Sequence, residues 1–206
     1  MRSHDKQESG AGRAGATGRV SASEVALLGI FIAYALIMSF VERMIPLNFS
    51  IPGIRLGLAN VVVLMAMYLF PLSRAFILML LKCVMAAFLG GGLSALFYSL
   101  GGSLLSFAVM LALMRLFAAG VKKTPPGDGG FHRSKERIGP VGVSVAGAVF
   151  HNIGQILVAC LLFQSWVVLV YLPVLLLIGI ITGGAIGIIV SRLRPHLEKF
   201  LNPEKG

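Results

Sequence analysis

Six long apolar stretches dominate the chain, and short polar or charged segments separate them. The stretches cover residues 23–41, 54–70, 73–89, 93–117, 139–163 and 167–190. Each is close to the length of about 20 apolar residues that a helix needs to cross a bilayer. The pattern predicts an all-α, polytopic membrane bundle of six transmembrane helices.

The segments outside these stretches predict how the chain is divided. Residues 1–20 are rich in Gly, Ala, Ser and Arg without a hydrophobic period, which is typical of a disordered tail. The first apolar stretch is longer than a signal-peptide core of roughly 7–15 residues, so we expect it to remain as a helix. The six-helix domain then covers residues 21–194, with a basic, Gly- and Pro-rich linker at 118–138 and a cytoplasmic tail at 195–206.

Composition and charge agree with a membrane protein. Hydrophobic residues make up 57% of the 206 residues and charged residues 13%, whereas a soluble domain has roughly 25% charged residues. The formal net charge of +10 does not indicate a nucleic-acid partner, because most basic residues fall in the tails and in alternate loops. Basic residues gather on the cytoplasmic side of membrane proteins. We therefore expect both termini in the cytoplasm and lipid around the bundle.

Three basic residues do not follow this distribution: Arg43, Arg55 and Lys82. Arg43 lies at the outer end of the first stretch, and Arg55 begins the second near the outer surface. Lys82 lies near the middle of the third stretch, about 12 Å beyond Arg74 along a helix. A lysine at that depth costs at least about 2.5–3.5 kcal/mol, so we expect it to face protein or water.

Polar side chains also interrupt the fifth apolar stretch, in the segment "VFHNIGQILVA" at residues 149–159. Helical geometry places them on one face of about 100°. That face carries Ser144, Gly147, Ala148, His151, Asn152 and Gln155, while Val149, Ile153, Ile156 and Leu157 face lipid. One interpretation is hydrogen bonding across the bundle, worth about 0.6 kcal/mol per residue. The other is a ligand cavity near the bilayer midplane, which the grouping of three polar residues at the depth of Lys82 favours.

Together, polar residues from several stretches predict one solute-binding pocket open to the outer side. Tyr98, near the outer end of the fourth stretch, can both stack on a ligand and hydrogen-bond to it. The predicted binding residues are Arg55, Asn60, Lys82, Tyr98, His151, Asn152 and Gln155. No acid lies deep in a stretch to match the basic residues, since Glu24 and Glu42 lie at the two ends of the first. We therefore expect a small solute that is anionic or rich in hydrogen-bond acceptors, although snorkelling and packing also explain Arg55 and Asn60.

Two stripes of small residues predict close helix packing. The first stretch and the segment before it carry Ala22, Ala26, Gly29 and Ala33, and the sixth stretch carries Gly179, Gly183 and Gly187. Such stripes let helix backbones approach closely. Packing within the bundle is their more common role, and docking of another subunit's helices is the alternative.

Several chemical motifs are missing from the sequence. There is no P-loop, and hence no ATPase in this chain. The only aspartates, Asp5 and Asp128, are too few to hold Mg²⁺ for diphosphate chemistry. Cys83 and Cys160 both lie in apolar stretches and have no metal-ligand spacing. We expect a chain that is not catalytic alone and that carries neither a metal nor a cofactor.

Three segments resemble a known family: "GIRLGLAN" at 53–60, "GGLSALFYSLGG" at 91–102 and "GAVFHNIGQ" at 147–155. In this order, over residues 23–192, they resemble the bacterial Gx transporter family, also labelled heptaprenyl diphosphate synthase component I. That family is similar to the S components of energy-coupling factor (ECF) transporters, six-helix proteins that capture vitamins or related solutes at the outer side. The resemblance implies a T subunit and two ATPases as partners, and a place in the bacterial inner membrane. It also implies a docking role for the stripe Ala22, Ala26, Gly29 and Ala33.

Two alternatives stand beside solute uptake. The second family label implies a non-catalytic membrane partner of a soluble prenyl diphosphate synthase, in isoprenoid or quinone biosynthesis, because the two Asp-rich motifs of such synthases are missing here. The other alternative is a subunit of a membrane redox assembly linked to flavin or quinone. The sequence has no recognisable motif for haem, an iron–sulfur cluster or covalent flavin.

Overall fold

The computed structural model describes residues 22–44, 55–119 and 139–201, and all regular structure in these ranges is helical. The predicted all-α fold class is therefore confirmed. The helices are α1 (Ala22–Met44), α2 (Asn60–Leu69), α3 (Leu72–Ala86), α4 (Gly92–Ala119), α5 (Pro140–Phe163) and α6 (Leu172–Leu201). A π-helical turn, η1 (Ala87–Gly91), joins α3 to α4, and a 3₁₀ turn, η2 (Trp166–Tyr171), precedes α6.

Five apolar helical segments of the described chain are long enough to cross a membrane. They cover Val25–Met44, Leu72–Leu89, Gly92–Leu116, Pro140–Phe163 and Trp166–Leu197. Large apolar side chains lie exposed along them, such as Phe88 on η1 and Leu161 on α5. Because exposed apolar surface of this extent suits lipid rather than water, the chain has the character of a multi-pass membrane protein.

The second predicted span differs from the observed structure. A helix was expected over residues 54–70, but α2 has ten residues, Asn60–Leu69, and is about 15 Å long. Residues 55–57 are not helical, and Gly57 has a φ of 81°, which helical backbone does not adopt. Every residue from Asn60 to Met67 is buried, so α2 is surrounded by protein instead of facing lipid. We call residues 55–59, which lead into this helix, the entry segment.

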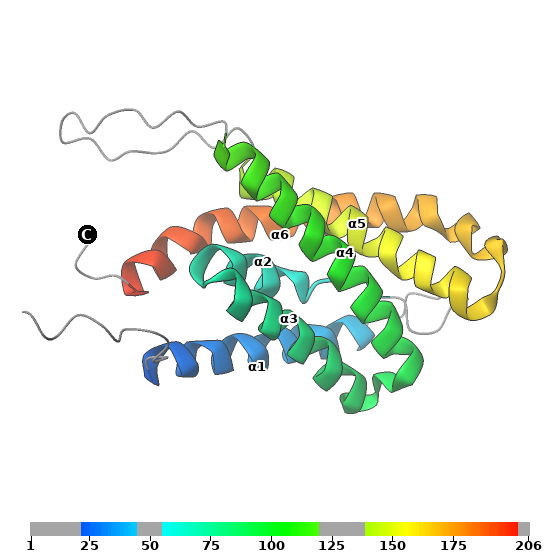
Figure 1. Ribbon diagram of the computed structural model, residues 1–206, viewed down its shortest axis with the longest axis horizontal. Helices are drawn as coiled ribbons and strands as arrows, with labels where there is room; N and C mark the ends of the chain where they lie inside the picture. The colour runs from blue at the N-terminus through cyan, green and yellow to red at the C-terminus, as the bar shows by residue number, and fades with distance from the viewer. Residues whose placement is uncertain (1–21, 45–54, 120–138, 202–206) are drawn as a thin grey trace, which may run out of the picture.

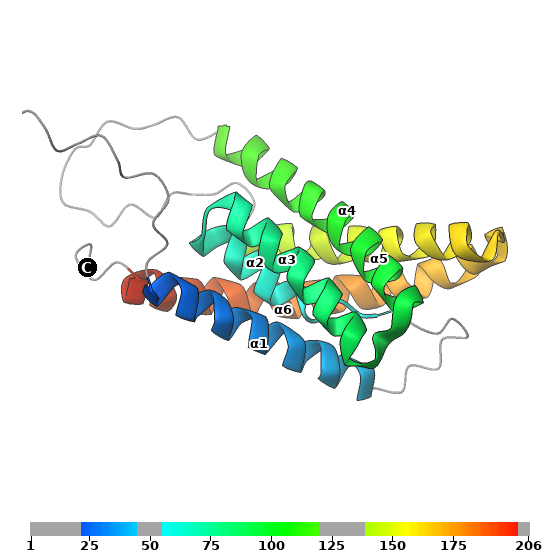
Figure 2. The ribbon, with the colours of Figure 1, turned by 60° about the horizontal axis from the view of Figure 1, so that its bottom comes forward.

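Helix α5 packs closely against α4 on one side and α6 on the other, and α5 and α6 run side by side (Figures 1 and 2). Glycines make both approaches possible. A Cβ atom on Gly154 of α5 would lie 2.6 Å from the backbone oxygen of Gly101 in α4. One on Gly183 of α6 would lie 2.8 Å from the Cα atom of Val145 in α5. The glycine stripe of the sixth predicted span is thus used for packing inside the bundle.

The polar face predicted for α5 is buried. Ser144, Gly147, Ala148, His151, Asn152 and Gln155 all lie inside the bundle. On the face predicted to meet lipid, Leu157 is 47% exposed. Ile156 is 1% exposed, so its predicted lipid contact is wrong. It packs instead against α4 and α6 residues such as Tyr98 and Leu175.

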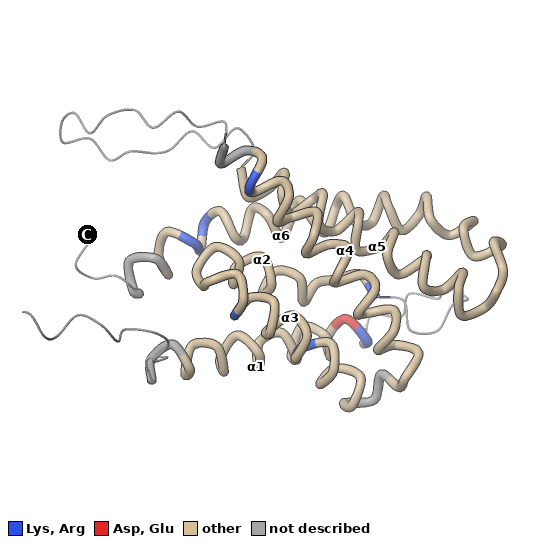
Figure 3. The backbone as a smooth tube through the Cα atoms, viewed as in Figure 1, with Lys and Arg blue, Asp and Glu red and all other residues tan. Residues whose placement is uncertain are grey.

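The two described ends of the chain lie together: α1 begins and α6 ends at the same end of the bundle (Figure 1). Lys and Arg positions gather toward that end, while a second charged group, which includes an acidic position, lies in the other half (Figure 3). This arrangement is compatible with the expected cytoplasmic termini. The predicted tail at 1–20 lies outside the described residues, and helix α6 continues past residue 195, where the second tail was expected, to Leu201.

Candidate functional site

A small cavity lies among α1, the entry segment, α3, α4 and α5. Its volume is about 20 Å³, which is room for one ordered water molecule. Charged, hydroxyl and small side chains line it: Ser39, Glu42, Arg55, Gly57, Ala59, Lys82, Cys83, Ala86, Ser99, Ser103 and His151. Of the seven predicted binding residues, Arg55, Lys82 and His151 line this cavity directly.

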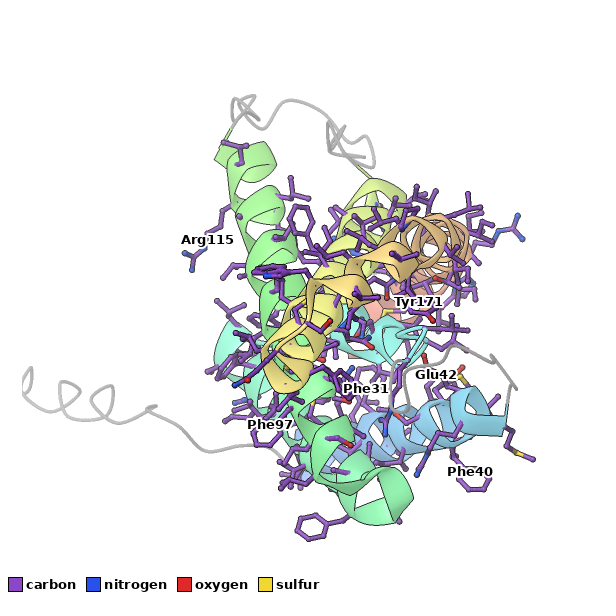
Figure 4. The ribbon with its side chains drawn as sticks, turned by 90° about the vertical axis from the view of Figure 1, so that its right-hand side faces the viewer. Phe31, Phe40, Glu42, Phe97, Arg115 and Tyr171 are labelled. Atoms are coloured by element: carbon purple, nitrogen blue, oxygen red, sulfur yellow. The ribbon has the colours of Figure 1, made fainter. Side chains whose placement is uncertain are left out.

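Glu42 is the charged residue of this site that was not among the predicted binding residues. It was expected at the outer end of the first span, but α1 continues to Met44 and the Glu42 side chain is only 5% exposed. Its carboxylate accepts hydrogen bonds from the backbone N–H groups of Gly57 and Leu58. Figure 4 shows Glu42 facing the entry segment, while Phe40 on the same helix points outward. The expectation that no acid matches the buried basic residues is therefore wrong.

The spacing of residues along α1 explains the position of Glu42. Ala35, Ser39 and Glu42 follow one another at steps of four and three residues, which places them on one helical face. All three are buried, with 0%, 3% and 5% of their surfaces exposed. Continuing this pattern beyond residue 41 would have identified the carboxylate from the sequence.

Lys82 and Asn60 form a buried polar pair. The Lys82 ammonium, 5% exposed, donates a hydrogen bond of 2.7 Å to Asn60 Oδ1. Asn60 is the first residue of α2, and its buried Nδ2 group has no hydrogen-bond partner within the part of the chain that the structure describes. The short helix α2 thus places an amide beside the cavity, with N–H donors left over on both members of the pair.

Gln155 holds the entry segment rather than lining the cavity. Its side-chain Oε1 accepts from the backbone N–H of Arg55 at 2.8 Å, and its Nε2 donates to the backbone oxygen of Arg55 at 2.9 Å. These two bonds satisfy backbone groups that a helix would otherwise satisfy internally. Arg55, which is half-buried, also lines the cavity. Gln155 acts on the cavity through the position of Arg55.

The imidazole of His151 fits between two glycines. A Cβ atom on Gly57 would lie 2.9 Å from His151 Cδ2, and one on Gly102 would lie 2.8 Å from His151 Nδ1. The histidine is 3% exposed. Any side chain at either glycine would have to displace the ring, so the two glycines make room for it at the cavity wall.

Tyr98 and Asn152 lie outside the cavity lining. Tyr98, 1% exposed, belongs to a cluster that we call the Tyr98 cluster: Tyr98, Ile156, Ala159, Cys160, Val168 and Leu175. Asn152 donates from Nδ2 to the backbone oxygen of Leu175 at 2.6 Å, beside this cluster. The structure therefore divides the predicted pocket into a charged cavity and a neutral, closely packed region.

The predicted docking stripe lies on the outer face of α1. Ala26, Gly29 and Ala33 are exposed, and a Cβ atom on Gly29 would meet nothing within 4 Å. The side chain of Ala22 lies outside the described residues. Ala35 and Glu42 lie on the opposite face of α1. One face of this helix therefore faces the cavity, and the stripe of small residues on the other face stays exposed.

Among the described residues, no group of three His, Cys, Asp or Glu side chains lies close enough together to hold a metal ion. Residues 31–193 of the chain match the protein-family model of heptaprenyl diphosphate synthase component I. No curated protein and no solved structure matches the chain.

Proposed function

The chain belongs to the heptaprenyl diphosphate synthase component I family, and on this premise we propose that it is a membrane-embedded solute-binding subunit. Like the S components of ECF transporters, it binds a small solute from the outer side of a bacterial inner membrane. Separately encoded subunits, a transmembrane T subunit and ATPases, supply the energy for uptake.

One observation carries this proposal: ionisable side chains gather around a cavity inside an apolar helical bundle. Glu42 and Lys82 are each 5% exposed, and Arg55 is half-buried beside them. Ionisable groups within membrane helices are costly, and they mark solute or ion sites more often than structural positions. Packing alone needs none of these charges, because Ala or Leu fills such space at lower cost.

The small size of the cavity implies that solute binding moves part of the wall. A volume of about 20 Å³ does not hold a vitamin-sized molecule. The entry segment is the part of the wall that is not helical, and Gln155 and Glu42 hold it by hydrogen bonds to Arg55, Gly57 and Leu58. We propose that the entry segment moves to admit the solute.

The outer face of α1 supplies the docking surface in this proposal. Ala26, Gly29 and Ala33 leave a shallow, exposed stripe on which a helix of the T subunit packs closely. Ala22 extends the stripe by one further turn. The docking helix is then the same helix that carries Glu42 to the cavity.

The family description favours a second candidate function. As component I of a heptaprenyl diphosphate synthase, the chain is a non-catalytic membrane subunit that recruits a soluble synthase. Its two aspartates, Asp5 and Asp128, do not supply the metal-binding carboxylates of prenyl transfer. A membrane redox assembly is a third setting for the same bundle.

Affinity purification from native membranes separates these functions. Uptake predicts that ATPases and a T-like subunit co-purify with the chain. It also predicts that Gly29→Leu, which fills the docking stripe, abolishes their recovery. Gly184→Leu is the matched control, because a Cβ atom at Gly184 on α6 also meets nothing within 4 Å. Recovery of a soluble prenyl synthase, with loss of its activity when this chain is deleted, would instead support the second function.

A thermal-shift screen of vitamins, flavins and quinone precursors then identifies the solute on the purified full-length protein. We expect the solute to raise the melting temperature of the wild type but not that of Lys82→Ala. Arg192→Ala is the control and should keep the ligand-induced rise, because Arg192 is exposed on the C-terminal part of α6. A ligand shift that survives in Lys82→Ala would place the binding site away from this cavity.

A further inference from the structure

The formal charges of the ionisable groups around the cavity do not sum to zero. Arg55 and Lys82 each carry one positive formal charge, and Glu42 carries one negative formal charge. With His151 neutral, the formal sum is +1. Moving a proton from Lys82 to Glu42 does not change this sum. The excess positive charge lies on Arg55, which is half-buried. A charge that is partly removed from water is stabilised by an opposite charge beside it, so the cavity favours a partner with a single negative charge.

Hydrogen-bond donors without a described partner lie at the same place. The Lys82 ammonium has three N–H donors, and the hydrogen bond that the structure describes for it uses one of them. Asn60 Nδ2 is buried, with no partner among the described residues. The Arg55 guanidinium brings further donors to the cavity wall. Because buried donors left unpaired destabilise the protein, an oxygen-rich group fits this position.

Glu42 determines which anion fits. Its carboxylate faces the cavity and is fixed by the N–H groups of Gly57 and Leu58, so it cannot swing away without breaking those bonds. A phosphate group carries about −1.5 to −2 charges at pH 7, and a diphosphate carries more. Such a group would exceed the available positive charge and repel Glu42. A carboxylate has one charge and two oxygens, so it matches the single excess positive charge and can accept from more than one of these donors.

We propose that the cavity recognises the carboxylate end of a monoanionic solute through Lys82, Arg55 and Asn60, and that Glu42 excludes phosphate and diphosphate groups. This inference rests on the proposed solute-binding function and names the chemical class of its substrate. It also predicts that a prenyl diphosphate is not the ligand of this cavity. The rest of the solute extends from the carboxylate toward the entry segment.

A native cysteine reports on the cavity. Cys83 lines it, is 1% exposed, and has its Sγ 3.4 Å from Ser103 Oγ. The other cysteine of the chain, Cys160, is 7% exposed and lies in the Tyr98 cluster. Alkylation of the full-length protein in detergent, followed by mass spectrometry of each cysteine peptide, gives both rates at once. Cys160 is the internal control for general loosening of the fold.

Three small probes at matched ionic strength test the charge and shape of the ligand group. We expect acetate to slow Cys83 alkylation by a factor of 1 + [acetate]/Kd, about tenfold at ten times Kd. Acetamide, which has the same shape without the charge, and inorganic phosphate should each change the rate less than about twofold. The Cys160 rate should not change with any of the three.

Glu42→Gln tests the part assigned to the carboxylate. Glutamine keeps an oxygen that accepts from Gly57 and Leu58 but removes the negative charge, so the formal sum rises to +2. Phosphate should then slow Cys83 alkylation by about tenfold at a concentration that has no effect on the wild type. An unchanged Cys160 rate shows that the variant is folded. Should the variant misfold, the wild-type probe series still decides the proposal.

The outcomes separate this inference from the proposed function. Equal slowing of Cys83 by acetate, acetamide and phosphate would overturn the carboxylate assignment and leave solute binding in place. Slowing by phosphate alone would overturn it in favour of a diphosphate-type ligand. If no probe changes the Cys83 rate in the wild type, both the inference and solute binding at this cavity are wrong.

Discussion

Two buried polar regions share α5, and they are built in different ways. Around His151 the bundle collects charged side chains, an entry segment without helix and a cavity of about 20 Å³. Around Asn152, the next residue, neutral side chains pack into the Tyr98 cluster, and the amide donates to the backbone oxygen of Leu175. His151 and Asn152 themselves are both buried. The difference is that the first region has charges and unpaired donors beside open space, and those are the features of a binding site.

The comparison shows that polarity within a membrane helix does not by itself indicate function. Asn152 is 0% exposed and stabilises the contact between α5 and α6. His151 is 3% exposed and faces α4 and the entry segment. Because successive residues on a helix point about 100° apart, neighbours in the sequence meet different helices. Substitutions in the two regions should therefore have different effects on solute binding and on stability.

Lys82→Met is expected to have the largest effect. It removes the buried ammonium that we propose pairs with the solute's carboxylate. Losing one member of a buried charge pair between binding partners weakens binding by about 2–5 kcal/mol, or roughly 30-fold and more. Equilibrium binding of the solute identified by the thermal-shift screen measures this loss. Asn152→Ala is the control and should change Kd less than about twofold. Equal losses in both variants would mean that the two regions form one site.

Gly57→Ala is expected to reduce stability more than Gly92→Ala. Both glycines have positive φ, 81° and 72°, so alanine costs about 1–3 kcal/mol of backbone strain at either position. Only at Gly57 does the new Cβ also meet His151, at 2.9 Å, which adds about 1–3 kcal/mol of overpacking. Thermal unfolding of both variants in the same detergent gives the difference. Identical melting temperatures would show that the His151 ring moves aside freely.

Asn152→Ala should lower stability by a smaller amount, about 1–2 kcal/mol, because it removes one buried hydrogen bond. The melting temperature should fall while solute binding stays close to that of the wild type. This pattern is the reverse of the one expected for Lys82→Met. Loss of binding without loss of stability would assign Asn152 to the solute site after all.

Apolar length and periodicity were sufficient for the long helices, though not for α2, and for the buried face of α5. The 3.6-residue repeat that groups Ser144, His151 and Gln155 does not depend on the rest of the fold, so it was visible in the sequence. The same repeat on α1 continues from Ala35 to Glu42, and the expected end of the span at residue 41 concealed it. Helix ends are the least certain part of such predictions, and here the uncertainty hid a charged residue of the candidate site.

The entry segment was not predictable from local sequence. Its backbone is held by Gln155, which lies 100 positions away from Arg55, and by Glu42 on another helix. An apolar stretch such as residues 54–70 favours a spanning helix as long as those partners are unknown. Likewise, nothing local distinguishes Tyr98 from the cavity residues. Only the packing of α4 against α5 and η2 places it in the neutral cluster.

Tyr98→Phe is expected to have the smallest effect, and it tests the boundary between the two regions. Tyr98 is 1% exposed among the apolar side chains Ile156, Val168 and Leu175. No hydrogen bond of its hydroxyl group is described in the resolved ranges 22–44, 55–119 and 139–201. Phenylalanine keeps the ring and its packing, so the change in unfolding free energy should stay within about 0.5 kcal/mol.

Solute binding should also be unchanged in Tyr98→Phe, within about twofold. Tyr98→Ala is the comparison, because it leaves a cavity in the Tyr98 cluster. It should lower the free energy of unfolding by about 3–5 kcal/mol, as for other large aromatic residues, and so lower the melting temperature. A weaker Kd in Tyr98→Phe at unchanged stability would mean that the hydroxyl group contacts the solute. The bound solute would then extend from the charged cavity into the Tyr98 cluster, and the division between the two regions would hold only for the protein without its ligand.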